Sequence, residues 1–286
     1  MIATTLVKKP FCLLNASSDE IYGDVRCAGN DSGKPAVIIC HSFMAFKDWG
    51  FFPYLAEELA RAGFLSVSFN FSYNGVAGHG NRITDFEKFE RNTFSRELED
   101  LDTVVRAVRG GKLGFDKYDS ESIVLLGHSR GGGIAAVYAS SNSAVKELVT
   151  WSAISTFDRW THHQKEKWIQ LRYLPLAKDT AVSPLRQGIG LLHDLQDHSE
   201  RLNILDAASR INIPWLILHG EADVTVPPRE AEHLYEVSRK NNVELKLLGK
   251  VGHLYSAASQ QENNYQTLNE IIHITTSWIH RHLEKE

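Results

Sequence analysis

Short apolar runs alternate with longer amphipathic stretches along most of the chain. The runs 36–40, 123–126 and 215–218 contain only apolar residues, as expected for strands that are covered on both faces of a sheet. Between such runs, apolar residues recur at helical spacing, most clearly over 94–108. This alternation predicts an α/β fold with a mostly parallel sheet and helices on both of its faces.

The N-terminal part departs from this alternation. Two candidate strands, 11–14 and 21–25, are separated by a turn rich in Asn, Ser and Asp, which predicts an antiparallel hairpin at one edge of the sheet. The other expected elements are helices over 52–59 and 268–283, strands over 65–71, 148–151 and 245–248, and a glycine-rich loop over 74–84.

One segment is too long to be a simple connection. Residues 155–210 separate two expected strands, whereas ordinary connections have about two to six residues. We therefore expect a core formed by residues 1–154 and 211–286, with residues 155–210 inserted as a helical lid. Ligand sites in open α/β sheets lie at the carboxyl ends of the strands, so the lid is expected to cover those ends.

The sequence around Ser129 combines a strand, a tight turn and a helix of small residues. Residues 127–131 read Gly-His-Ser-Arg-Gly, follow the apolar run 123–126 directly and match the pattern G-x-S-x-G. In that pattern the serine lies in a strained strand-to-helix turn and its hydroxyl projects from the sheet edge. The flanking glycines have a steric reason, because a side chain at either position would collide with the neighbouring strand or helix. Ser129 is therefore the candidate nucleophile.

An activated serine needs a base and an acid that orients the base. Asp223 follows a buried strand, and His253 follows the next expected strand. The chain order Ser129, Asp223, His253 is the order found in α/β-hydrolases, with each residue at the carboxyl end of a strand. Two other acids compete with Asp223, since Asp158 lies shortly after the preceding strand and Glu221 is two residues away. The position favours Asp223 as the acid and His253 as the base.

Other histidines near these motifs have structural interpretations. His128 and His219 lie at positions that are expected to pack around the serine turn and the acid loop. His193 and His198 are five residues apart and do not share a helix face, so no metal site is expected there.

Taken together, these motifs resemble the α/β-hydrolase superfamily from about residue 20 to the C-terminus. In detail the chain is similar to serine esterases and peptidases with a small helical lid, including feruloyl (cinnamoyl) esterases and dienelactone-hydrolase-like proteins. The resemblance implies an oxyanion hole formed by two backbone N–H groups, those of Arg130 and Phe43. The family commonly has His-Gly just before the second donor, where this chain has His41-Ser42. The Arg130 side chain has two interpretations, a contact to an acidic group of the substrate or a structural salt bridge.

The composition indicates which partners and which compartment to expect. Lys and Arg total 31 against 35 Asp and Glu, a net charge of −4, so no basic surplus indicates nucleic acid or an anionic membrane as a partner. The cysteines, Cys12, Cys27 and Cys40, have no metal-ligand spacing and indicate a reducing compartment. Neither a signal peptide nor a run of about 18 apolar residues is evident, so we expect a cytoplasmic protein. The sequence does not indicate its oligomeric state.

The predicted chemistry is acyl transfer to water by a carboxylesterase-like serine hydrolase that needs no cofactor. Ser129 would attack the carbonyl of a small-molecule ester with a small or medium acyl group while His253 takes the serine proton. A serine rather than an aspartate nucleophile argues against dehalogenase and epoxide-hydrolase chemistry. Peptidase, thioesterase and C–C hydrolase activity use the same triad and stay open, as does a ligand-binding sensor with slow turnover.

The lid carries large aromatic side chains. Trp160, Trp168 and Tyr173 are candidate substrate contacts suited to an apolar or aromatic acyl group. They are equally consistent with the lid's own core.

Overall fold

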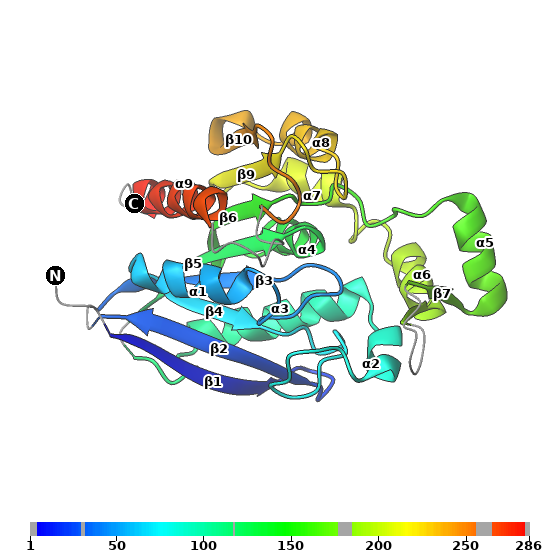
Figure 1. Cartoon of the computed structure of the whole chain (residues 1–286), viewed down its shortest axis with the longest axis horizontal. Helices are drawn as coiled ribbons and strands as arrows, with labels where there is room; N and C mark the ends of the chain where they lie inside the picture. The colour runs from blue at the N-terminus through cyan, green and yellow to red at the C-terminus, as the bar shows by residue number, and fades with distance from the viewer. Residues whose placement is uncertain (1–4, 30–31, 117, 177–184, 256–264, 284–286) are drawn as a thin grey trace.

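The computed structural model describes residues 5–29, 32–116, 118–176, 185–255 and 265–283. A central eight-stranded sheet runs through these residues in the order β1-β2-β4-β3-β5-β6-β9-β10 (Figure 1). Its strands are β1 (Leu6–Leu14), β2 (Glu20–Ala28), β3 (Lys34–Cys40), β4 (Leu65–Phe69), β5 (Tyr118–His128), β6 (Val145–Trp151), β9 (Trp215–Gly220) and β10 (Val243–Leu248). β2 is antiparallel to β1 and β4, and the other neighbouring strands are parallel. The predicted α/β fold, with an antiparallel hairpin at one sheet edge, is confirmed.

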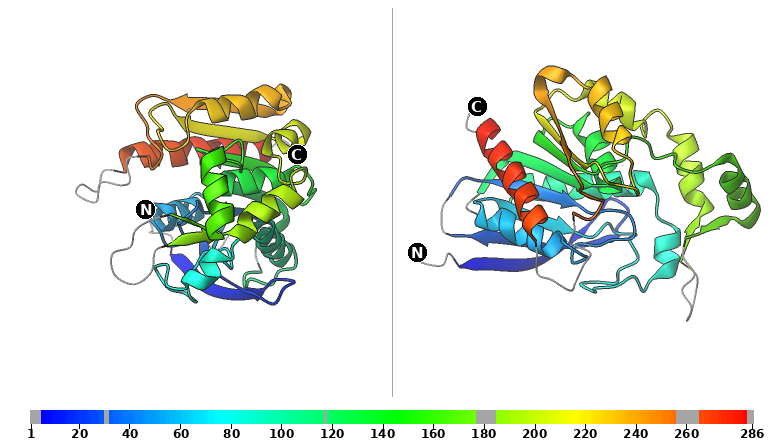
Figure 2. Two further views of the ribbon diagram at one scale, coloured as in Figure 1. Left: turned by 90° about the vertical axis from the view of Figure 1, so that its right-hand side faces the viewer. Right: turned by 45° about the horizontal axis from the view of Figure 1, so that its top comes forward.

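Helices cover both faces of the sheet. α1 (Phe52–Arg61) and α9 (Gln266–Leu283) lie side by side on one face (Figure 1, Figure 2). The other face is covered by α3 (Phe94–Arg109), α4 (Arg130–Ala139), α7 (Ile204–Arg210) and α8 (Arg229–Val237). A short helix, α2 (Phe86–Glu90), lies in the connection between β4 and α3. Within the described residues, no helix has both the length and the apolarity that a bilayer crossing requires.

Successive side chains of a strand point to opposite faces of the sheet, so each buried strand contributes to two separate cores. In β3, Ala36 and Ile38 pack on the side of α3 and α4, whereas Val37 and Ile39 pack on the side of α1 and α9. Because both faces of such a strand are covered, every position of the run is apolar. This explains why the strand appears in the sequence as an uninterrupted apolar run.

The segment between β6 and β9 forms small elements of its own. They are α5 (His162–Leu171), β7 (Tyr173–Pro175), β8 (Arg186–Gly188), α6 (Ile189–Asp197) and α7, and residues 177–184 lie outside the described part. α5 and α6 project at one end of the molecule, away from the two chain termini (Figure 1, Figure 2). α7 packs against α4 and α8 of the core. The antiparallel pair β7–β8 was not predicted, because strands of three residues are too short to show a periodicity.

Candidate active site

Ser129 lies in a strained turn between β5 and α4. Its φ of 56° and ψ of −119° place it in a backbone region that residues other than glycine rarely adopt. The end of β6 holds this turn in place, since the Ser129 N–H donates to Trp151 O over 2.9 Å and the Ile154 N–H donates to Ser129 O over 3.3 Å. The predicted strand–turn–helix around this serine is therefore present.

Glycines let the turn fit between its neighbours. A Cβ atom on Gly131 would lie well inside van der Waals contact of the Cys40 and His41 carbonyl oxygens. A Cβ on Gly127 would collide in the same way with Gly131 O. The steric reason inferred from the motif therefore applies to both glycines, and backbone atoms that cannot rotate away make the contacts.

A hydrogen bond joins His253 to Asp223. His253 Nδ1 lies 2.7 Å from Asp223 Oδ2, and Asp223 Oδ1 accepts the N–H groups of Thr225 (2.9 Å) and Val226 (2.8 Å). Burial alone would raise the pKa of Asp223, but the hydrogen bonds from His253 and Val226 outweigh it and hold the pKa below its ordinary value. Since an ionised carboxylate can only accept, Nδ1 of His253 carries the proton and Nε2 can accept one.

The competing acids lie elsewhere. Asp158 pairs with Lys165 on the surface, and both side chains are partly exposed. The Glu221 side chain is also exposed. Asp223 is the acid that the structure joins to His253.

Ser129 and His253 line the same cavity, which has a volume of about 420 Å³. Of the other residues singled out in the sequence, Phe43, Arg130 and Trp160 also line it. Side chains that sequence reasoning missed complete the wall, namely Ser42, Met44, Trp49, Phe94, Ile154, Phe157, Arg159, Thr225, Val226 and Leu254. Several of them follow a strand by only a few residues, which is the signal that could have identified them.

The three aromatic residues singled out in segment 155–210 have different places. Trp160 faces the cavity, and the fully buried Trp168 packs edge-on against it with ring centroids 4.9 Å apart. Tyr173 lies in β7, where the Arg186 guanidinium sits 4.7 Å from its ring. Trp168 and Tyr173 are therefore outside the described lining of the cavity.

Arg130 and Phe43, the proposed oxyanion donors, both belong to the residues that line the Ser129 cavity. Arg130 is the first residue of α4, so its N–H has no preceding helical carbonyl to bond. Phe43 lies in a turn closed by the Ala45 N–H donating to Ser42 O over 3.2 Å, with Met44 at a φ of 58°. The Ser42-Phe43 pair lines the cavity even though the family's usual glycine is replaced by Ser42.

The Arg130 side chain forms a buried ion pair. Its Nη2 lies 2.9 Å from Glu97 Oε1, and its Nε donates to Glu97 Oε2 over 3.0 Å. The guanidinium also lies against the rings of Phe43 and Phe94, at 4.8 and 4.4 Å from their centroids. Of the two interpretations from the sequence, the structural salt bridge is present.

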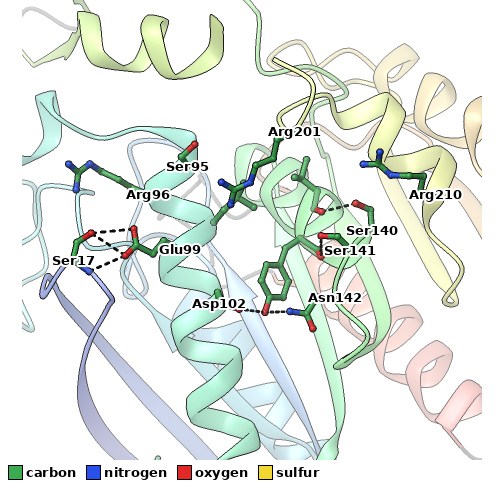
Figure 3. A pocket seen from close by; sticks show the side chains of 13 residues that line it. Ser17, Ser95, Arg96, Glu99, Asp102, Ser140, Ser141, Asn142, Arg201 and Arg210 are labelled. Atoms are coloured by element: carbon green, nitrogen blue, oxygen red, sulfur yellow. Dashed lines mark hydrogen bonds between the residues drawn. The ribbon is translucent and has the colours of Figure 1, made fainter. Parts of the chain in front are cut away.

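A larger cavity, of about 710 Å³, lies among α3, the end of α4 and Arg210 of α7 (Figure 3). Its two acids are already bonded within the protein, Glu99 to the N–H and hydroxyl of Ser17 and Asp102 to the hydroxyl of Tyr138. None of the residues of the Ser129 site lines it. The smaller cavity, which both Ser129 and His253 line, is therefore the candidate active site.

Comparison with known sequences agrees with this geometry. A family model described as the alpha/beta hydrolase fold matches residues 35–187. The chain is also 26% identical over 232 residues to a Bacillus subtilis (strain 168) protein named uncharacterized peptidase YuxL. That match covers 79% of this chain but only 31% of the relative, so the chain spans less than a third of the relative's length.

Solved structures give the same fold. The esterase domain of a Rhodothermus marinus protein is 18% identical, covers 96% of this chain and 98% of its own, and superposes with a TM-score of 0.64. Est1E of Butyrivibrio proteoclasticus is 15% identical, covers 96% of this chain and 99% of its own, and gives a TM-score of 0.68. The family model covers more than half of the chain. The chain belongs to the α/β-hydrolase fold family.

Proposed function

We propose that this protein is a serine hydrolase that cleaves carboxylic esters with a small or medium acyl group. One observation carries the proposal, namely that the strained Ser129 and the Asp223-bonded His253 open into one cavity. A nucleophile, a base and an acid that orients the base are the parts that covalent acyl transfer requires.

In the proposed mechanism, Ser129 Oγ attacks the ester carbonyl while His253 Nε2 accepts the hydroxyl proton. Asp223 keeps the imidazole in the tautomer that leaves Nε2 free and stabilises the imidazolium that forms. His253 then protonates the departing alcohol, and water repeats the two steps on the acyl-enzyme. The N–H groups of Arg130 and Phe43 would donate to the oxyanion, and such donors are worth roughly 3–4 kcal/mol each.

The walls of the cavity support an apolar acyl group. Phe43, Met44, Phe157 and Trp160 present rings or a thioether to a space of about 420 Å³, a size that suits small or medium ligands. We propose that residues 155–210 act as the lid that selects the acyl group, since Phe157 and Trp160 come from this segment.

A peptidase is the second candidate, because the relative from Bacillus subtilis is named as one. Amide substrates separate the two, because activated esters are intrinsically reactive and both kinds of enzyme cleave them. A peptidase turns over aminoacyl or peptidyl p-nitroanilides, whereas a carboxylesterase hydrolyses p-nitrophenyl butyrate and leaves these anilides essentially uncleaved.

The test is steady-state hydrolysis of p-nitrophenyl acetate, butyrate, octanoate and cinnamate by wild type and by Ser129→Ala. We expect turnover by wild type and a loss of about 10⁴- to 10⁶-fold in kcat in the variant, if the triad acts as a unit. A variant that kept a tenth of the wild-type activity would exclude Ser129 as the nucleophile. A stoichiometric burst without turnover across the whole panel would point instead to a sensor that keeps the triad.

A further inference from the structure

Three buried histidines lie at the carboxyl ends of strands that carry the site. His41 follows β3, His128 is the last residue of β5, and His219 lies near the end of β9. Each is at most 4% exposed. The proposed reaction uses none of them directly.

The hydrogen-bond partners fix the tautomer of each ring. His128 Nε2 lies 3.0 Å from His253 O, and His219 Nε2 lies 2.8 Å from Val226 O. Because a carbonyl can only accept, Nε2 carries the proton in both rings. Nδ1 of each ring has no hydrogen-bond partner among the described residues, which agrees with a nitrogen that carries no proton.

His41 uses the opposite tautomer. Its Nδ1 lies 2.8 Å from Ser42 O, so Nδ1 donates. Its Nε2 accepts the Phe71 N–H over 3.3 Å and lies 3.4 Å from Asn74 Nδ2. Burial lowers the pKa of His41 to about 4 and that of His128 to about 3, and it lowers the pKa of His219 as well. All three rings are therefore neutral near pH 7.

Each of these bonds ends on a loop that carries one part of the site. Ser42 O belongs to the same planar peptide unit as the Phe43 N–H, so holding this carbonyl also sets the direction of the proposed oxyanion donor. His128 holds the backbone carbonyl of His253 itself. Val226, whose carbonyl accepts from His219, donates its own N–H to Asp223 Oδ1.

We propose that His41, His128 and His219 are positioning residues, each of which holds one loop of the active site through a ring N–H that donates to a backbone carbonyl. His41 sets the oxyanion loop, His128 the base loop and His219 the acid loop. The inference rests on the proposed function of Ser129, Asp223 and His253. Misplacement of reacting groups by about 1 Å can cost on the order of 100-fold in rate, so bonds of this kind bear directly on turnover.

The test compares variants that remove the donor with variants that keep it. His→Leu at each position fills a similar volume without an N–H. His128→Gln and His219→Gln carry an amide N–H at a reach similar to Nε2, and His41→Asn carries one at a reach similar to Nδ1. We expect each Leu variant to lose about 10- to 100-fold in kcat with little change in KM, and each amide variant to retain most of it.

Rates are expressed per active site titrated with a fluorophosphonate, so that misfolded protein does not count. His41→Leu should also weaken binding of a trifluoromethyl ketone, which mimics the tetrahedral adduct, by the same factor as its loss in kcat, while binding of the carboxylate product stays unchanged. If a Leu variant does not fold, His128→Gln against His128→Asn replaces it, because the shorter amide cannot reach His253 O and should be the slower of the two.

His280 in α9 is the matched control, since its Nε2 lies 3.0 Å from Ala62 O and its ring stacks on Phe64 outside the cavity. His280→Leu should lower stability and leave kcat per titrated site unchanged. Leu variants at positions 41, 128 and 219 that keep wild-type kcat per titrated site would overturn the proposal. A wild type that the fluorophosphonate does not label would instead overturn the proposed function.

Discussion

The turn that carries Ser129 is one of several strained backbone positions near the proposed site. Ser129 and Met44, which both line the cavity, have a positive φ, as do Ser152, just after β6, and Tyr255, two residues after His253. Such a conformation costs roughly 1–2 kcal/mol per residue and persists only where neighbouring bonds hold it. One such bond joins Tyr255 to Ser152, whose hydroxyls are 2.9 Å apart. A strained backbone that is held by such bonds is consistent with a site that presents the Ser129 side chain in one direction.

The role of Asp223 can be tested against its rival. Asp223→Asn replaces an oxygen that accepts from His253 and favours the wrong tautomer, so kcat should fall by about 10⁴-fold. Asp158→Asn changes a surface pair with Lys165 and should leave kcat near wild type. Hydrolysis of p-nitrophenyl butyrate by both variants is the measurement. If Asp158→Asn were the damaging change, the acid would lie in the other loop.

At the level of the elements, close packing of α4 against β3 places the serine turn beside the end of β3, which leads into the proposed oxyanion loop, residues 41–43. Gly131 permits this approach, because a Cβ there would meet the Cys40 and His41 carbonyls. At Gly133, two residues along the same helix, a Cβ would meet side chains instead, namely Ile204 Cδ1 at 2.8 Å, Ile154 Cγ1 at 3.0 Å and Phe157 Cε1 at 3.4 Å. Flexible side chains can move aside where backbone carbonyls cannot.

This difference predicts opposite outcomes for two Gly→Ala changes in one helix. Gly131→Ala should destabilise by about 1–3 kcal/mol through overpacking and should remove most activity by displacing the oxyanion loop. Gly133→Ala should stay within about 1 kcal/mol of wild type and remain active. Urea unfolding and ester hydrolysis measure both effects. Equal behaviour of the two variants would mean that the turn after Ser129 tolerates a side chain at position 131.

Segment 155–210, the proposed lid, contains aromatic side chains for which we expect different roles. Trp160 lines the cavity, so Trp160→Ala should shift preference among acetate, butyrate, octanoate and cinnamate esters by roughly 10- to 200-fold, the range given by about 1–3 kcal/mol of apolar contact. The buried Trp168 supports it from behind, and Trp168→Ala should cost about 3–5 kcal/mol of stability. Values of kcat/KM across the panel, with unfolding curves, separate the two. A uniform loss on all esters in Trp160→Ala would move substrate selection to other walls of the cavity.

At the scale of the whole molecule, the sequence predicts what depends on local pattern. Buried parallel strands appear as apolar runs, and the turn after β5 carries its own glycine signal, so the fold and the candidate residues Ser129, Asp223 and His253 could be named in advance. Other parts of the cavity wall could not, because Phe94, on α3, meets the loops that carry Ser129 and His253 only through long-range packing. The partner of Arg130 was open for the same reason, since Glu97 lies on a different helix.

Buried titratable groups make stability depend on pH. The folded pKa of His41 is about 4 and that of His128 about 3, against about 6.5 for an unfolded histidine. Between pH 4 and 6.5 the unfolded chain therefore binds more protons at these sites, so their contribution is complete above pH 6.5 and is lost as the pH falls. Burial raises the pKa of Asp100 to about 7, and its contribution has the opposite sign, being lost as the pH rises from about 4 to 7.

A single variant isolates one of these contributions. His128→Gln removes one titrating group. Between pH 6.5 and 4 the unfolding free energy of the variant should therefore fall less steeply than that of wild type, and the two slopes should differ by about 1 kcal/mol per pH unit. Urea unfolding of both proteins at pH 4.5, 5.5 and 6.5 measures the difference, in which Asp100 and the other shared groups cancel. Parallel curves would mean that the histidine titrates normally in the folded state.

If Ser129 is the nucleophile, its hydroxyl oxygen becomes acylated during turnover. The most direct measurement is mass spectrometry of the protein quenched in acid while it hydrolyses p-nitrophenyl butyrate, with wild type, Asp223→Asn and Ser129→Ala side by side. We expect a butyryl adduct on the peptide that contains Ser129 in wild type and in Asp223→Asn, more abundant where deacylation is slowed, and no adduct in Ser129→Ala. Turnover by wild type with an adduct on another residue, or an adduct that persists in Ser129→Ala, would contradict this role of Ser129.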